Sequence, residues 1–287
     1  MSETAASDPE NTVAFQGEPG AYSNLACRQV FPDMTALPCS TFEDAFDAVS
    51  EGLARYAMIP IENSVAGRVA DIHQLLPEAD LHFVAEHFLR VNHHLLAPRG
   101  ASLKTLKRVT SHVQALGQCH DTLRGLGLIP VSHADTAGAA RQVAELNDPT
   151  LGAIASSLAG EIYGLQSLMA DVEDAAHNTT RFIVMAHKPI KPAQDILTMM
   201  SFIFQTRNVP AALYKALGGF ATNGINMTKL ESYQLEGSFN ASQFYADIEG
   251  HPDDRSVQLA MEELDFFTTN LRIMGVYPAH SYRKGAA

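Results

Sequence analysis

Short apolar runs alternate with helical segments along most of this 287-residue chain. Runs such as 12–16 and 56–60 have the length and composition of buried strands, and each leads through a turn into an amphipathic stretch. Strands that alternate with helices build a sheet covered by helices. The pattern over residues 12–187 therefore predicts an α/β fold, which we expect to form two lobes with a cleft between them.

The expected elements of this region can be placed by residue number. Strands are expected at 12–16, 35–39, 56–60, 107–111, 129–132 and 152–155, and a long strand at 81–96 is expected to cross between the lobes. Helices are expected at 21–31, 41–52, 112–126, 138–146 and 158–163. Thr41 and Asp44 have the spacing of a capping box, which supports a helix start at this point.

The pattern changes after a proline-punctuated linker at residues 188–195. Strands are expected at 196–205, 225–234, 239–249 and 271–277, with helices at 210–222 and 253–267. Pro210 suits the first turn of its helix. The order βαββαβ predicts a small α+β domain of ferredoxin-like plan at 196–280. The polar, acidic residues 1–12 are expected to form a disordered tail, which leaves 13–187 as the main domain.

Charge and composition exclude several classes of partner. The formal net charge is -12 at pH 7, which argues against nucleic acid or an anionic membrane as the main partner. No apolar run approaches the roughly 18 residues of a membrane span. The three cysteines, at positions 27, 39 and 119, lack zinc-type spacing and fit reduced thiols in a cytoplasmic protein. His82, His87, His93 and His94 lack the spacing of metal ligands and are better interpreted as structural or exposed. We therefore expect no metal.

Polar residues gather where the expected strands end. In open α/β sheets ligands bind outside the carboxyl ends of the strands. The candidates there are Tyr22, Ser23, Glu62, Asn63, Ser64, Ser111, His112 and Gln114. A helix-capping role is an equal alternative for Glu62. Cys119 beside a histidine could be a nucleophile, but a small apolar core thiol is the better interpretation.

One five-residue stretch, 178–182, combines an amide, two hydroxyls, a guanidinium and an aromatic ring. It is expected to be a loop that enters a strand at Phe182. A loop in this place can direct Thr180 and Arg181 into a cleft while the strand holds them still. The alternative is a polar turn before a core strand.

Five segments in the same order resemble the prephenate dehydratase family, and the resemblance extends over residues 13–278. The segments are 16–23, 60–64 with Gly67, 111–119, 135–137 and 178–182. Val113 stands where the family pattern usually has proline. The resemblance implies a two-lobed catalytic domain like type II periplasmic binding proteins, joined to a C-terminal ACT domain. It also implies the conversion of prephenate to phenylpyruvate, carbon dioxide and water, with no cofactor.

The resemblance also assigns roles to residues. Thr180, Arg181 and Phe182 are the expected catalytic residues, with Thr180 as donor to the leaving hydroxyl and Arg181 as a bidentate carboxylate anchor. Asn178 joins the eight candidates above as a substrate-binding residue. Either His112 or Glu62 could be the ultimate proton source, and the sequence leaves this open.

The expected ACT domain would bind an amino-acid effector, with phenylalanine as first choice. The residues expected to bind this effector are Ala211, Ala212, Leu213, Glu231 and Ser232. Two family motifs are altered, because Ala211 replaces a glycine and Tyr233-Gln234 replace arginine and proline. A homodimer or homotetramer is expected, since the sheet of such a domain leaves an edge and a face that pair readily. The rival interpretations are arogenate dehydratase, or a non-catalytic amino-acid sensor.

Overall fold

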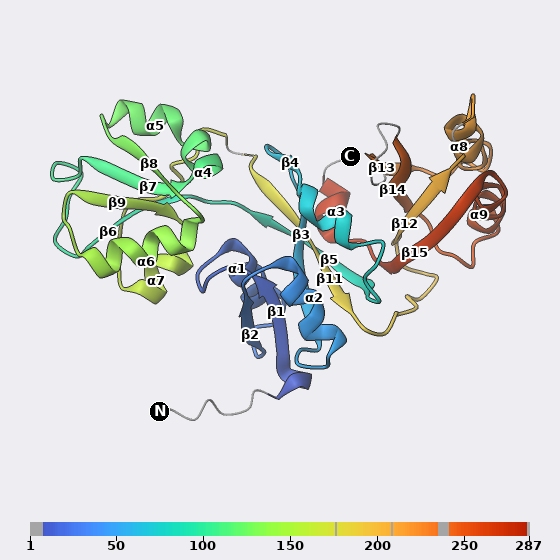
Figure 1. Ribbon diagram of the computed structural model, residues 1–287, viewed down its shortest axis with the longest axis horizontal. Coiled ribbons are helices and arrows are strands. Elements are labelled where there is room, and N and C mark those ends of the chain that lie inside the picture. The colour runs from blue at the N-terminus through green and yellow to red at the C-terminus, as the bar shows by residue number, and fades with distance from the viewer. Residues whose placement is uncertain (1–7, 176, 208, 235–240, 286–287) are drawn as a thin grey trace. The chain divides into compact units, whose positions relative to one another are not determined.

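The computed structural model describes residues 8–175, 177–207, 209–234 and 241–285 (Figure 1). Contacts divide the chain into two compact units, and each unit is built from two separate segments. The first unit contains Met1–Ile72 and His87–Phe182, and the second contains His73–Glu86 and Ile183–Ala287. The chain therefore passes between the units three times, within the elements α3 (Ala70–Leu75), β5 (His82–Arg90) and β11 (Thr179–Ala186).

The first unit begins with a parallel sheet centred on β1. In chain order its elements are β1 (Thr12–Gln16), α1 (Tyr22–Val30), β2 (Thr35–Cys39), α2 (Phe42–Ser50), β3 (Tyr56–Asn63) and β4 (Gly67–Arg68). The strand β1 pairs in parallel with β2 on one side and β3 on the other, while β4 folds back antiparallel on β3. The predicted capping box is confirmed, because Thr41 and Asp44 each bond the other's backbone N–H.

A second, five-stranded sheet in the same unit has the order β10-β6-β9-β7-β8 (Figure 1). Its elements are β6 (His94–Ala97), β7 (Arg108–His112), α4 (Val113–Gln118), α5 (His120–Gly125), β8 (Ile129–His133), α6 (Thr136–Leu146), β9 (Leu151–Ala155), α7 (Ser157–Tyr163) and β10 (Gln166–Met169). Strands β7, β8 and β9 are parallel, and β6 and β10 are antiparallel to their neighbours. The apolar residues Leu95, Val109 and Ile154 form part of its core.

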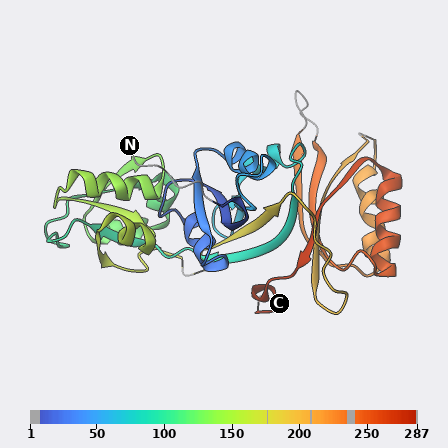
Figure 2. The ribbon, with the colours of Figure 1, turned by 90° about the horizontal axis from the view of Figure 1, so that it is seen from below.

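The second unit contains a β-α-β-β-α-β series. Its elements are β12 (Thr198–Thr206), α8 (Ala212–Thr222), β13 (Met227–Gln234), β14 (Ala241–Glu249), α9 (Arg255–Phe267) and β15 (Thr268–Pro278). These strands form antiparallel pairs in the order β13-β14-β12-β15. Both helices cover the same face of the sheet (Figure 2), and Phe202 and Phe204 of β12 pack there with Phe220 of α8. On the far side of β15, Gly275 pairs in parallel with Phe83 of β5.

The stretch 178–182 differs from its prediction. Asn178 precedes the strand, but Thr179, Thr180 and Arg181 already lie within β11, so the predicted loop is wrong for these three residues. The reason is a main-chain bond: the carbonyl of Thr179 accepts from Ser64 N–H at 2.8 Å, which extends the strand beyond its apolar run. Glu62 and Asn63 likewise lie inside β3 rather than after it.

Two long predicted elements are each interrupted. The stretch 81–96 forms β5 and β6, and at His93 the backbone N–H bonds the carboxylate of Glu173 instead of a strand. The predicted helix 112–126 breaks into α4 and α5 at Cys119. Cys119 leaves the helical region (φ -115°, ψ 16°), and its N–H bonds the carbonyl of Leu116 only three residues back. Neither interruption has a proline to signal it.

Two predicted termini also shift. Pro210 lies before α8, which begins at Ala212 after Ala211 in a left-handed conformation (φ 63°). Of the expected tail, residues 1–7 lie outside the described part of the chain, but Pro9–Asn11 form a 3₁₀ turn and Thr12 is buried in β1. The side chain of Asp8 stabilises this turn by accepting from Glu10 N–H. In the described part of the chain, no helix has the length and apolar character needed to cross a membrane.

Candidate functional site

Three predicted polar residues of the first unit are in direct contact. Asn63 at the end of β3 donates through Nδ2 to Asn178 Oδ1 at 2.8 Å and to Thr180 Oγ1 at 2.9 Å. Asn178 is only 1% exposed, whereas Thr180 is partly exposed. The strands β3 and β11 therefore bring together residues that are more than 100 positions apart in the sequence.

The backbone of the β3–β4 turn fixes which way the Asn63 amide points. Asn63 Oδ1 accepts from the backbone N–H of Val65 at 2.9 Å and of Ala66 at 2.8 Å. The amide nitrogen must therefore face Asn178 and Thr180, and its two hydrogens are both used. Thr180 Oγ1 is consequently an acceptor from Asn63. Its own hydroxyl hydrogen stays available for donation, which is what the protonation of a leaving hydroxyl requires.

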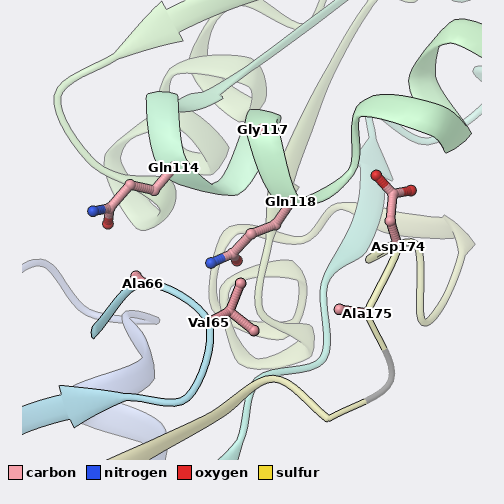
Figure 3. A pocket seen from close by; sticks show the side chains of 7 residues that line it. All are labelled: Val65, Ala66, Gln114, Gly117, Gln118, Asp174 and Ala175. Atoms are coloured by element: carbon pink, nitrogen blue, oxygen red, sulfur yellow. The ribbon is translucent and has the colours of Figure 1, made fainter.

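Gln118, at the end of α4, continues this contact. Its Oε1 accepts from Asn178 Nδ2 at 2.9 Å and lies 2.9 Å from His93 Nε2. Its side chain also lines a cavity of about 430 Å³. Figure 3 shows Gln114 and Gln118 projecting from α4 towards the turn that carries Val65 and Ala66. The other lining residues are Gly117, Asp174 and Ala175. Amide groups therefore line one wall of a space large enough for a small-molecule substrate.

Arg181 occupies a different setting from the one its predicted role suggests. Its guanidinium is 2% exposed and pairs with the carboxylate of Glu62, with Nη1 3.0 Å from Oε1. Glu62 is 31% exposed, so this pair extends from the interior towards solvent. The role of Arg181 as a carboxylate anchor stays a prediction. Glu62 lies inside β3 and pairs with Arg181, and its helix-cap alternative likewise stays a prediction. Phe182, also on β11, is 1% exposed, which places its ring in the hydrophobic core.

The remaining candidates divide into two groups. Ser64 lies at the site: its Oγ donates to the carbonyl of His177 at 2.7 Å and accepts from Thr179 N–H at 2.9 Å. Ser111 is fully buried and donates to the carbonyl of Ile154 at 2.6 Å, so its hydroxyl serves the five-stranded sheet. His112 Nδ1 accepts from Gln114 N–H at the start of α4, as a helix cap does.

Tyr22 and Ser23 lie at the start of α1. Ser23 is 8% exposed. The Tyr22 hydroxyl is 2.7 Å from His93 Nδ1, and the two rings meet edge to face with centroids 5.5 Å apart. Burial, and to a lesser extent the nearby Cys119 and Glu173, raises the pKa of Tyr22 well above its usual value. Tyr22 is therefore a neutral hydrogen-bonding group in the interior of this site.

The structure favours the core-thiol interpretation of Cys119. The side chain is fully buried, and burial raises the pKa of the thiol to about 12. At neutral pH such a thiol carries almost no thiolate. Among the described residues, no three His, Cys, Asp or Glu side chains gather closely enough to hold a metal ion. The expectation of a metal-free reaction stays a prediction.

A family model described as prephenate dehydratase matches residues 13–190. The chain belongs to the prephenate dehydratase family. Family members are hydro-lyases, so the chain is an enzyme of this class and the non-catalytic sensor alternative is not retained.

Relatives of this family match along almost the whole chain. A bifunctional N-acyl-homoserine lactone acylase/prephenate dehydratase of Komagataeibacter europaeus is 51% identical, over 96% of this chain and 98% of its own. Arogenate dehydratase/prephenate dehydratase 2 of Arabidopsis thaliana is 40% identical, over 97% of this chain and 75% of its own. The crystal structure of prephenate dehydratase from Arthrobacter aurescens, in complex with L-Phe, is 27% identical with a TM-score of 0.86, over 96% of each chain. The α/β fold is therefore that of solved prephenate dehydratases.

Sequence reasoning missed two residues of the site in this family member. Gln118 lies inside a predicted helix, and nothing in the pattern marks that helix as ending at its position. His93 lies in a predicted strand, and its 2% exposure shows that it is an interior residue. The available signal was positional: Gln118 is one turn after Gln114 on the same helix, so both amides project from one face.

Proposed function

We propose that this enzyme converts prephenate to phenylpyruvate, carbon dioxide and water. The ring carbon–oxygen bond breaks, and the hydroxyl leaves as water with one added proton. The bond to the ring carboxylate breaks as carbon dioxide departs, and its electron pair completes the aromatic ring. The observation that carries the proposal is the Thr180 hydroxyl, which accepts from Asn63 and thereby keeps its hydrogen for the leaving group.

Neutral amides at the cavity suit this reaction. The ring carboxylate loses its charge as carbon dioxide forms, so a strong cationic grip on it would favour the ground state over the transition state. Gln114 and Gln118 can orient a carboxylate as hydrogen-bond donors without that penalty. The proton delivered through Thr180 would come from Glu62 or His112.

The test is direct detection of both products. Purified enzyme should release phenylpyruvate and carbon dioxide in equal amounts from prephenate. Arogenate is the close alternative, and it carries an amine where prephenate carries a ketone; the Arabidopsis relative bears both activities in its name. Competing kinetics with both compounds measure the preference. Absence of product from both would overturn the proposal.

We propose further that residues 196–280 form an ACT domain that binds phenylalanine. The β-α-β-β-α-β order and the strand order β13-β14-β12-β15 support a ferredoxin-like unit. The Arthrobacter relative was solved with L-Phe. Ala211 is the N-cap of α8, and Ala212 and Leu213 begin the helix. Glu231 and Ser232 lie on β13 of the same unit. Glu231 lies 3.2 Å from Lys229 Nζ.

Two measurements test this regulation. Titration calorimetry with phenylalanine on the full chain, followed by rate assays, should show binding and inhibition. Glu231→Ala should weaken both without changing the uninhibited rate. A full chain that shows neither phenylalanine binding nor inhibition by phenylalanine would overturn the regulatory role.

We also propose that the enzyme is cytoplasmic and assembles as a homodimer or homotetramer. Size-exclusion chromatography of the purified protein at micromolar concentration should show a dimer or tetramer, and a monomer would contradict the assembly.

The Komagataeibacter relative gives a second candidate function, hydrolysis of N-acyl-homoserine lactones at the amide bond. The structure offers a hydroxyl–imidazole pair for acyl transfer, because Ser167 Oγ on β10 lies 2.9 Å from His94 Nδ1 on β6. The same hydroxyl also donates to the carbonyl of Met169 at 3.2 Å, and this bond must break before His94 can take the hydrogen. The pair is exposed, unlike Cys119. Release of the fatty acid by the wild type, and its loss in Ser167→Ala, would support this candidate. An inactive wild type would remove it.

A further inference from the structure

A continuous chain of hydrogen bonds leads from Thr180 to Tyr22, and its first link determines all the others. The two backbone N–H groups of the β3–β4 turn fix Asn63 Oδ1, so Asn63 Nδ2 donates to Asn178 Oδ1. An amide presents oxygen on one side and nitrogen on the other. Asn178 must therefore donate through Nδ2 to Gln118 Oε1, and the nitrogen end of Gln118 is left to face the cavity that its side chain lines.

The same logic sets the proton on His93. Gln118 Oε1 is an acceptor, so the imidazole nitrogen 2.9 Å away, Nε2, must carry the hydrogen. Burial lowers the pKa of His93, which keeps the ring neutral at pH 7 and leaves Nδ1 without a hydrogen. Nδ1 then needs a donor. The Tyr22 hydroxyl has one hydrogen, which it shares between Nδ1 at 2.7 Å and the main-chain oxygen of Asn92 at 2.9 Å.

The backbone holds the imidazole in place as well. His93 N–H donates to Glu173 Oε2 at 2.8 Å, and the Glu173 side chain is only 2% exposed. The ring is thus held by its main chain, by Tyr22 and by Gln118, and it is itself 2% exposed. Such a residue cannot reach a substrate in the cavity, but it can determine where Gln118 presents its amide.

We propose that His93 is a positioning residue: as the neutral Nε2–H tautomer it holds Gln118 Oε1, so that the Gln118 amide nitrogen is presented to a carboxylate of the substrate. The kinetic part of this inference rests on the proposed dehydratase function. The tautomer part does not, because it follows from the hydrogen bonds alone. The two parts can therefore be tested separately.

The tautomer is tested with Asn178→Asp. A carboxylate at 178 has no hydrogen to donate, so Gln118 should turn its nitrogen towards it and present nitrogen to His93 as well. His93 Nε2 must then accept, and the ring should change from Nε2–H to Nδ1–H. The ¹⁵N shifts of the imidazole report this change directly. His94 is the matched control, because its partner Ser167 is not part of the series of hydrogen bonds from Thr180 to Tyr22. His94 should therefore keep its tautomer.

The NMR outcomes are decisive in both directions. A wild type with Nε2–H and an Asn178→Asp variant with Nδ1–H support the coupling of Asn178 to His93. A His93 that keeps Nε2–H in both proteins would overturn it, since that tautomer is then independent of the amide chain. Neither result depends on which substrate the enzyme turns over.

The positioning role is tested with two isosteric variants. His93→Gln places an amide nitrogen near the former Nε2 and can still donate to Gln118. His93→Asn places an oxygen near the former Nδ1, so it keeps the Tyr22 contact and loses the donor. We expect KM for prephenate to rise about tenfold in His93→Asn and to stay within about twofold in His93→Gln, as loss of one hydrogen bond implies.

A purely structural histidine would give a different pattern. Both variants would then lose thermal stability and change KM to the same extent, and this result would overturn the positioning role. If the wild type makes no phenylpyruvate, the proposed function fails, while the tautomer experiment still reports on His93. If KM separates the two variants but melting temperature does not, the positioning role is supported.

Discussion

Each of the two units contains a buried polar network, and the two networks differ in where they end. In the first unit, amides link Asn63, Asn178 and Gln118 and finish at a cavity. In the second unit, Ser201, Tyr245, Asp247 and Tyr277 bond one another, and each of these side chains is fully buried. Both satisfy the requirement that buried polar groups be paired.

The chemistry of the second network is that of a structural cluster. Asp247 Oδ1 accepts from Ser201 Oγ at 2.5 Å and from Tyr245 OH at 2.6 Å, and Tyr277 OH lies 2.6 Å from Ser201 Oγ. The residues come from β12, β14 and β15, so the cluster ties three strands together across the sheet. The first network instead keeps a hydroxyl hydrogen on Thr180 and an amide on Gln118 available. A network that keeps donors at an open space can serve a ligand, whereas a network of fully buried side chains serves the fold.

Removal of the Thr180 hydroxyl gives the largest expected effect. Thr180→Val keeps the shape and the strand preference but removes the donor, so kcat should fall by about 100-fold or more with KM little changed. Steady-state kinetics measure this. Thr180→Ser keeps a hydroxyl and should recover most of the rate. A valine variant with near wild-type kcat would remove the main difference between the two networks.

Removal of a hydroxyl from the second network should act on stability alone. Tyr245→Phe takes one donor from Asp247 and should lower the free energy of unfolding by about 2 kcal/mol. Denaturant titration measures the loss, and kcat should stay within about twofold. Tyr214→Phe is the matched control, because Tyr214 is 80% exposed and should change neither quantity. A fall in kcat without a fall in stability would contradict the structural role.

Arg181 combines a feature of each network: its side chain is buried like those of the second network, and it follows Thr180 of the first network on β11. Arg181→Lys keeps the charge beside Glu62 but loses the planar fork. We expect KM for prephenate to rise about tenfold, a change equivalent to about 1.4 kcal/mol. Glu62→Gln is the companion variant, because it weakens the same pair from the other side. An unchanged KM with a lower melting temperature would make Arg181 a structural residue.

The smallest effect is expected at the start of α8. Ala211 has φ 63°, a conformation that costs an L-residue with a side chain about 1 kcal/mol and costs glycine little. Ala211→Gly should therefore raise the free energy of unfolding by about 0.5 kcal/mol, after allowing for the greater freedom of glycine in the unfolded chain. Ala212→Gly, one residue later inside the helix, should lower it. Equal signs for the two variants would contradict this reasoning.

Sequence predicted the elements of the fold well because they are specified locally. Strands β1 and β2 match their predicted bounds, and the cap at Thr41 follows from neighbours within three residues. The breaks at His93 and Cys119 were missed because long-range partners cause them: Glu173 takes the N–H of His93, and Asp174 N–H bonds the carbonyl of Gln118. No local pattern announces a partner 80 positions away.

The candidate site was predicted in part for the same reason. Asn63 could be chosen because it follows an apolar run, and Asn178 and Thr180 because they precede one and fit a family motif. The structure brings the three residues into contact. The burial of Ser111 and Arg181 could not be foreseen, since polar residues are ordinarily exposed and these two are enclosed by distant elements. Gln118 and His93 were missed because their role depends on which end of an amide faces which neighbour.

The ion pair between Glu86 and Arg283, near the C-terminal end of the described residues, has a consequence for synthesis on the ribosome. In the second unit, Arg283 makes a two-pronged contact with Glu86, whose side chain is fully buried, and the two residues are 197 positions apart. A ribosome that adds roughly 5–20 residues per second needs roughly 10–40 s to make that interval. During this time the rest of the second unit is not yet complete, so the segment His73–Glu86 cannot pack into it. Arg283 has not yet been synthesised, so Glu86 cannot form its ion pair with that residue. A nascent chain stalled before residue 283 should therefore be digested within this segment by proteases that the finished protein resists.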